Sequence, residues 1–415
     1  MSKKNSIIII IIVILLLFVG LIFLLFSSNS NNTSTGVSTQ TSTSPFGNNS
    51  SNKISTTTIK NVNGQSASTT KNLADLIQLY RNPTSGSVFF VNKKGQDALR
   101  FVDRAVGNIY EYIPETQTGE VTRITNTTIP KIQEAVWSNS GSNLIYRFLE
   151  NDTDNINNFS SLIKMSSSSI SSSLQGEITG QFLQSNIKQI VINPKGDKIF
   201  GLLDKSDKSG SYGFIANIDG SNSKMIFDSQ LLYWNISWPK ENIITFTTKP
   251  NYTDGGLLYF FNPQTYSMDK ILGGVVGLST LTNKDGSLLA YSHSLSNSFL
   301  LNIYDVTNRI SSDLSVSTLA DKCVWGNANN KTLYCAIPQD IPSDNYPDAW
   351  YQGLESFSDN IWKIDVQTGN VTEIYQIGSN ESASIDAFNL TISNNDKYLV
   401  FTNKNDLSLW MLQMK

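Results

Sequence analysis

Residues 190–200 read IVINPKGDKIF, and this stretch decides the fold. A short apolar run, 190–192, enters a polar turn that contains Pro194 and Gly196, and a second apolar run follows at once. Asn and Gly supply the positive φ angles that tight hairpins require. The stretch therefore predicts two antiparallel strands joined by a short turn.

The same pattern returns along the chain, as AVWSNSGSNLIY at 135–146 and LTNKDGSLLAY at 281–291. Weaker copies make six turns in all, beginning at 138, 193, 238, 283, 326 and 393, most of them roughly 43 to 55 residues apart. A second hairpin signal follows the copies, for example at 303–308. Four strands repeating at this spacing indicate the blades of a β-propeller. A large β-sandwich, the alternative, does not predict a constant spacing.

The turn copies resemble the S-P-D-G-K repeat of TolB-like and WD-repeat-like propellers, best at 193–198 and 283–288. The resemblance covers roughly residues 84–415. It implies a propeller fold and says little about function, because the motif is short and in several copies its serine is replaced.

Seven blades fit the chain, and six or eight are the alternatives. Six four-stranded units are expected at about 84–125, 133–182, 187–228, 232–273, 276–316 and 321–377, and three last strands at 386–392, 398–402 and 407–413. The last unit lacks a strand, and the apolar segment from Leu73 to Tyr80 is spare. We expect this segment to complete the last blade and close the ring.

The first 71 residues predict a membrane anchor and a tether. Ile7 to Phe26 forms an apolar run long enough to span a hydrocarbon core of roughly 30 Å. Lys3 and Lys4 precede it, so residues 1–6 are expected in the cytoplasm. A cleaved signal peptide is the alternative, but the run is long and no A-x-A-like site follows. The Ser-, Thr- and Asn-rich residues 27–71 predict a disordered linker, and 72–415 the propeller. The chain is thus expected to be a single-pass protein of the cell membrane with its propeller outside.

The two cysteines, Cys323 and Cys335, flank a predicted hairpin whose turn lies near Asn329. If Trp325 pairs with Leu333, the cysteines face each other across two strands, close to disulfide geometry. An oxidising compartment permits the bond, so we predict a Cys323–Cys335 disulfide.

The sequence offers few groups for chemistry. Charged residues make up 16% and the net charge is −3, so nucleic acid is not an expected partner. A single histidine, His293, cannot build a histidine metal cluster, and no G-x-S-x-G is present. The acids Glu150, Asp152 and Asp154 lack the spacing of an EF-hand.

The sequence therefore predicts no cofactor, no metal, no catalytic residue and no enzyme. A tethered binding or scaffold module for a protein or glycan is expected instead. The alternative is a propeller enzyme, of the lyase or glycosidase type, with carboxylates at the axial channel.

An insertion at about Gln339 to Asp359, between the second and third strands of the sixth unit, is the candidate binding region. Six of its residues could form the site: Tyr346, Trp350, Tyr351, Phe357, Asp344 and Asp348. Aromatic rings provide contact area and carboxylates provide orientation. Alternatively, the rings fold back and plug the loop onto the propeller.

Overall fold

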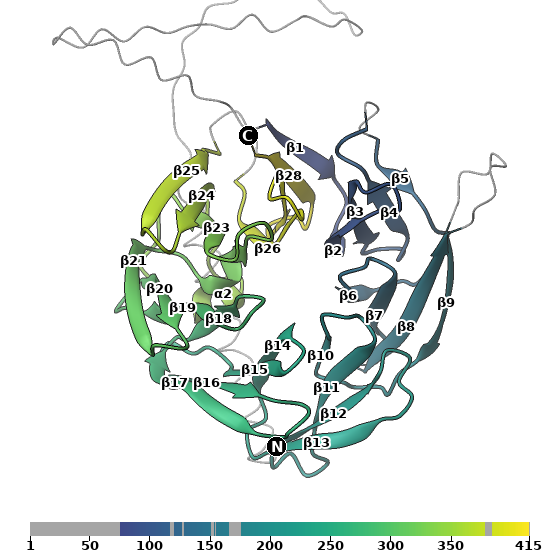
Figure 1. Cartoon of the computed structure of the whole chain (residues 1–415), viewed down its shortest axis with the longest axis horizontal. Helices are drawn as coiled ribbons and strands as arrows, with labels where there is room; N and C mark the ends of the chain where they lie inside the picture. Colours follow the sequence, from purple (N-terminus) through teal and green to yellow (C-terminus); the bar gives the residue numbers. More distant parts are fainter. Residues whose placement is uncertain are drawn as a thin grey trace, which may run out of the picture. The chain divides into compact units, whose positions relative to one another are not determined.

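The computed structural model describes residues 75–116, 120–126, 128–150, 153, 155–165, 176–377 and 384–414, all within the unit Thr70–Lys415. These residues form seven four-stranded antiparallel sheets arranged as the blades of a ring (Figure 1). The strands of the first three blades are β2 (Thr84–Val91), β3 (Asp97–Asp103), β4 (Ile109–Tyr112), β5 (Thr122–Arg123), β6 (Ile132–Trp137), β7 (Asn143–Leu149), β8 (Ile156–Met165), β9 (Gly176–Phe182), β10 (Gln189–Ile192), β11 (Lys198–Asp204), β12 (Ser211–Asn217) and β13 (Lys224–Ser229). Blades 4 to 6 consist of β14 (Trp234–Lys240), β15 (Ile243–Thr248), β16 (Gly255–Phe261), β17 (Met268–Val276), β18 (Ser279–Thr282), β19 (Leu288–Ser294), β20 (Phe299–Asp305), β21 (Ile310–Val316), β22 (Cys323–Trp325), β23 (Thr332–Pro338), β24 (Asp359–Asp365) and β25 (Asn370–Tyr375).

The seventh blade closes the ring, as predicted. It combines β26 (Ala387–Ile392), β27 (Tyr398–Asn403) and β28 (Leu409–Gln413) with β1 (Asp75–Tyr80) in the order β1-β28-β27-β26. Strand β1 runs antiparallel to β28, with Asp75 opposite Gln413 and Leu76 opposite Leu412. Pairing the two ends of the propeller removes the free sheet edge that an open ring would leave.

Four of the six repeated turns, those beginning at 138, 193, 283 and 393, share one local hydrogen bond. The first turn residue accepts the backbone N–H five residues later: Asn193 Oδ1 from Lys198 at 2.9 Å, and Asn283 Oδ1 from Leu288 at 3.0 Å. Ser138 and Ser393 make the same bond through their hydroxyls, at 3.1 Å. Ser and Asn can both supply the acceptor, which explains why the first position of the repeat alternates between them.

The same turns join neighbouring blades. Contacts between successive blades include Asn193 with Glu241, the Lys240 ammonium with the Asp285 carbonyl, the Asn327 amide with Asp396, and Asn394 with Asp97. The last of these links blade 7 to blade 1. The polar residues of the repeated turns therefore stabilise the ring as well as their own hairpins.

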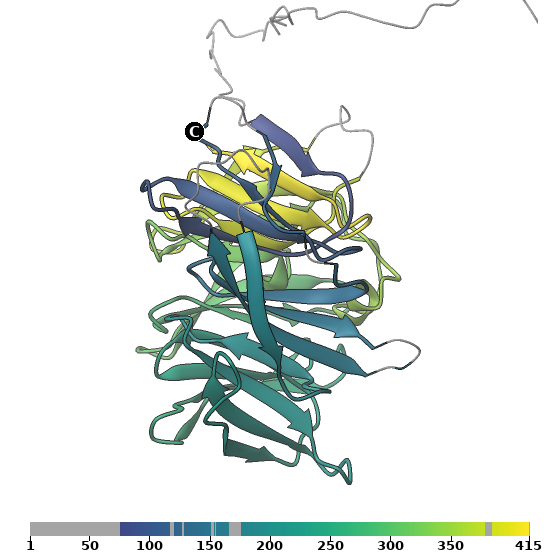
Figure 2. The ribbon, with the colours of Figure 1, turned by 90° about the vertical axis from the view of Figure 1, so that its right-hand side faces the viewer.

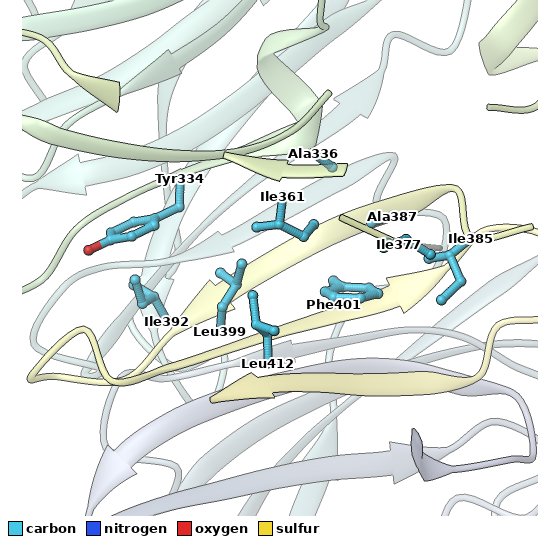
Figure 3. Packing of buried hydrophobic residues seen from close by; sticks show 10 residues of the cluster. All are labelled: Tyr334, Ala336, Ile361, Ile377, Ile385, Ala387, Ile392, Leu399, Phe401 and Leu412. Carbon is cyan, nitrogen blue, oxygen red and sulfur yellow. The ribbon is translucent and has the colours of Figure 1, made fainter. Parts of the chain in front are cut away.

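Apolar side chains fill the space between adjacent sheets. The sheets themselves stack face to face around the ring, as the view from the side shows (Figure 2). Between blades 6 and 7, Ile361 packs with Leu399, Phe401 and Leu412, all fully buried (Figure 3). Each sheet is buried on both faces in this way, which accounts for the near-continuous apolar runs of the middle strands.

The predicted disulfide is present between Cys323 of β22 and Cys335 of β23. The two residues are directly opposite in the strand register, and Trp325 pairs with Leu333 as expected. Their Cα atoms are 4.1 Å apart. The bond links the two inner strands of blade 6.

The predicted anchor at 7–26 and linker at 27–71 lie outside the described residues. Within the part of the chain that the structure describes, no helix has the length and apolarity needed to cross a membrane.

Candidate functional site

The insertion of blade 6 forms a strap, residues 339–358, between β23 and β24. It carries α2 (Asp348–Tyr351), which lies on the inner side of the ring (Figure 1). The strap reaches two other blades. Ser294 of blade 5 donates its hydroxyl to the Tyr346 carbonyl, and the Tyr252 N–H of blade 4 donates to Asp348 at 2.8 Å. The strap therefore bridges from blade 6 to blade 4 at the inner rim.

Three of the predicted binding rings are buried. Tyr346, Trp350 and Phe357 are at most 3% exposed and pack with Phe299 and Leu319 of blade 5 and its exit loop. The centroids of Phe299 and Tyr346 are 5.1 Å apart. These three residues follow the fold-back interpretation, since buried rings cannot meet a partner while the strap stays in place.

The other three predicted residues remain at the surface. Tyr351 is 37% exposed, and Asp344 and Asp348 are half-buried. Asp348 and Tyr351 line a groove, whereas Asp344 accepts the N–H of Asn345 within the strap.

This rim groove has two adjoining parts of about 460 Å³ and 480 Å³. One wall is α2 and the others come from blades 3 and 4. Both parts share Leu232, Tyr233, Lys249, Pro250 and Asp348, so the groove is continuous. The first part is lined in addition by Lys188, Gln189, Leu202, Leu203, Asp204, Ser211, Trp234, Asn235, Tyr351 and Gln352.

Exposed tyrosines and charges of both signs give the groove its character. Tyr233 is 67% exposed, and the Lys249 ammonium lies 5.7 Å from the centre of its ring. Lys188 lies 3.6 Å from Asp204, which also binds Lys208 at 2.8 Å. A ligand here would meet ring faces, ammonium groups and carboxylates, of which Asp204 and Asp348 already have partners.

Tyr351 is held at its hydroxyl end, which donates to Asp321 at 2.6 Å. Burial of that end, together with the Asp321 carboxylate, raises the pKa of Tyr351 well above its usual value. The phenol therefore stays protonated at neutral pH, and its ring is fixed beside the groove.

A buried charge cluster lies beneath the strap. We call Lys322, Asp359 and Asp386 the pin cluster; all three side chains are fully buried. Lys322, from the 3₁₀ turn η1 (Ala320–Lys322), bonds both carboxylates, Asp359 at 2.8 Å. Burial raises the pKa of Asp359 to about 6, although the charge of Lys322 opposes this shift. Among the described residues, Asp359 Oδ1 has no hydrogen-bond partner.

Sequence reasoning missed most of these groups. Lys188, Tyr233 and Lys249 lie far along the chain from the strap, and no motif marks them. Asp386 and Lys322 each stand at the entrance to an inner strand, where a charged residue looks like an ordinary loop residue. Only their position under the strap gives them a role.

The remaining sequence candidates do not assemble a site. His293 Nδ1 lies 2.8 Å from the Asn302 side-chain amide of the neighbouring strand. Glu150 is exposed, and Asp152 and Asp154 lie outside the described residues. In the described ranges, no three His, Cys, Asp or Glu residues are grouped so that they could hold a metal ion.

Comparison with known proteins gives matches to solved structures alone. No family model matches the chain, and no curated protein sequence does. An oligogalacturonate lyase in complex with manganese matches at a TM-score of 0.50 and 12% identity, over 83% of this chain and 98% of that one. A puromycin hydrolase matches at 0.51 and 11%, over 77% of this chain and half of the other. TolB from Acinetobacter baumannii matches at 0.42 and 10%, over 64% and 58%.

At these identities the likeness shows the fold. The chain is a seven-bladed propeller, as the repeat predicted, and its fold is similar to that of the oligogalacturonate lyase and of part of the puromycin hydrolase. The prediction that the chain is not an enzyme is wrong, because its premise does not hold. It took the lack of histidine-based motifs to indicate a non-catalytic propeller, but enzymes occur among the structural neighbours, and one is matched over almost its entire length. The fold and the missing motifs therefore do not separate a binder from an enzyme.

Proposed function

We propose that the rim groove binds an oligosaccharide that carries carboxylate groups. The observation that supports this most is the grouping of exposed tyrosines around one continuous groove. Tyr233 and Tyr351 line it, and Tyr252, 43% exposed, lies beside it through the bond of its N–H to Asp348. The apolar face of a sugar ring packs against an aromatic face, and its hydroxyls bond polar groups at the edges.

The charges of the groove support an acidic ligand. Asp204 is paired with two lysines, and Asp348 accepts a backbone N–H. Lys188 is paired with Asp204, whereas Lys249 is in no ion pair among the described residues and lies over the Tyr233 ring. Lys249 is therefore the ammonium group that a carboxylate of the ligand would meet, although the exposed Asp254 also lines the second part of the groove. The two adjoining parts of the groove suit a chain of linked sugars better than a single one.

A second candidate function is cleavage of the bound saccharide. It is supported by the oligogalacturonate lyase, whose chain is matched over 98% of its length, so that a propeller of this size can make up nearly a whole enzyme. In the groove, Lys249 and Tyr233 are the groups that could exchange a proton with a bound sugar. Appearance of unsaturated products from oligogalacturonate would identify this activity.

We further propose that the propeller is held outside the cell membrane by residues 7–26. The apolar run and the preceding Lys3 and Lys4 support this orientation. The disulfide of blade 6 also fits an oxidising compartment. The groove would then face extracellular or envelope polysaccharides.

The test is binding of oligogalacturonate, and of a neutral oligosaccharide of the same length, by calorimetry. Tyr233→Ala should weaken binding by about fivefold or more, on the scale of the roughly 1–3 kcal/mol that stacking of a nucleobase on an aromatic ring is worth. Tyr266→Ala is the matched control: Tyr266 is also exposed and lies under a lysine, Lys224, at 5.1 Å, but it lines neither part of the groove. Equal affinity of both variants, or binding of peptides without any saccharide binding, would contradict the proposal.

A further inference from the structure

The pin cluster is bonded to blade 7, where the Ala387 N–H donates to Asp359 at 2.6 Å, and also to the strap. Asp386, in the loop before β26, accepts three strap donors: the Trp350 indole N–H at 2.9 Å, the Phe357 backbone N–H at 3.1 Å and the Ser356 hydroxyl at 3.2 Å. A fourth donor is the Lys322 ammonium. One buried carboxylate of blade 7 thus collects three groups of the blade 6 insertion.

Trp350 is the strap residue that contacts the pin cluster most closely through its side chain. Two ammonium groups lie near its ring, that of Lys322 at 5.2 Å and that of Lys404 at 4.9 Å from ring centres. Lys404, from the β27–β28 connection, also donates to the Trp350 carbonyl at 2.8 Å. The indole is therefore fixed in position and in rotation about its side-chain bonds.

A buried charged group is expensive to keep. Replacing buried ion pairs with apolar residues is often neutral or stabilising, so such a pair is weak support for a purely stabilising role. Here Lys322 and Lys404 balance Asp359 and Asp386, and the network defines one geometry for the strap. Directional hydrogen bonds to a carboxylate fix position in a way that apolar packing alone does not.

The geometry leads from the pin cluster to the groove through one short helix. Trp350 faces the cluster, while its neighbours Tyr351 and Asp348 line the groove. We propose that Asp386 is a positioning residue: it pins α2 at the inner rim and thereby sets where Tyr351 and Asp348 stand in the groove. The positioning of α2 by Asp386 does not depend on the proposed function of the groove; only the expected effect on saccharide binding rests on it.

The experiment is hydrogen–deuterium exchange on the full chain in mild detergent. Asp386→Asn keeps the size of the side chain but puts an N–H₂ group where donors converge. Exchange of residues 339–358 should become about tenfold to a hundredfold faster, as expected for losing hydrogen bonds to a charged group. Exchange in the strands of blades 2 to 4 should stay as in the unaltered chain. The affinity for oligogalacturonate should fall in the same variant, because the strap residues that line the groove are no longer held in place.

Two further variants keep the test decisive. Trp350→Phe retains an aromatic ring beside the two ammonium groups and removes the indole donor together with part of the ring's volume, so it tests the same contact if Asp386→Asn does not fold. Asp228→Asn is the control, because Asp228 pairs with Lys205 at 2.7 Å on an exposed outer strand. It should leave strap exchange and affinity unchanged.

Unchanged strap exchange in both Asp386→Asn and Trp350→Phe would overturn the proposal. Equal loss of protection in all blades would also overturn it, because the cluster would then support the ring as a whole. A loosened strap in a protein whose unaltered form binds no saccharide would uphold the pin and reject the proposed function of the groove.

Discussion

Removing the side chain of Trp350 tests how the strap is held. The ring is 3% exposed, packs with Phe357 and Ala349, and donates its N–H to the buried Asp386. Emptying a buried tryptophan site costs about 3–5 kcal/mol through lost transfer energy and the cavity that remains. The lost donor to a buried carboxylate places Trp350→Ala at the upper end of this range.

The assay is chemical denaturation of the full chain in mild detergent, followed by far-ultraviolet circular dichroism. Leu354→Ala is the matched control, because Leu354 is in the same strap and 71% exposed. It should change the unfolding free energy by no more than about 0.5 kcal/mol. A Trp350→Ala protein that unfolds at the same denaturant concentration as this control would refute the packing argument.

Three further predictions concern the disulfide, the pin cluster and the topology. Without reductant, Cys323 and Cys335 should resist alkylation in mass spectrometry, and alkylation of both thiols in the unreduced protein would exclude the bond. Replacing both with Ala should lower the unfolding free energy by about 3 kcal/mol, which is the loop entropy for their separation of 12 residues. Because the pKa of Asp359 is raised to about 6, ionisation of this carboxyl group opposes folding. Its contribution to the unfolding free energy is about 3 kcal/mol; it is present below about pH 4 and is lost as the pH rises through about 6. Denaturation curves between pH 4 and 7 should show that fall, and Asp359→Asn should remove it; parallel pH profiles would show that Asp359 titrates normally. Protease added to intact cells with any outer barrier opened should release a folded fragment that begins within residues 27–71, whereas protection until the membrane is lysed would reverse the orientation.

The fold could be predicted from the sequence because its signals are local. The acceptor at the first position of four of the turns and the glycine that follows in three of them, as in Asn193 and Gly196, act within a few residues. Repetition of that unit then determines the architecture, since one blade cannot bury its faces without the next. The disulfide was predictable for the same reason: the register of a hairpin between Cys323 and Cys335 is fixed by its own turn.

The candidate site depended on the tertiary structure. From the sequence, the strap could be recognised as an insertion, but Trp350 and Tyr351 were equal candidates there, although one is buried against Asp386 and the other lines the groove. Their partners come from other blades: Tyr233 and Lys249 belong to blade 4, and Asp386 to the loop before β26 of blade 7. The bonds of Trp350 to Asp386 and of Tyr252 to Asp348 join residues 36 and 96 positions apart and leave no periodic pattern in a single sequence. The strand pattern therefore determined the ring, and only the packing of its blades decided what the inner rim presents.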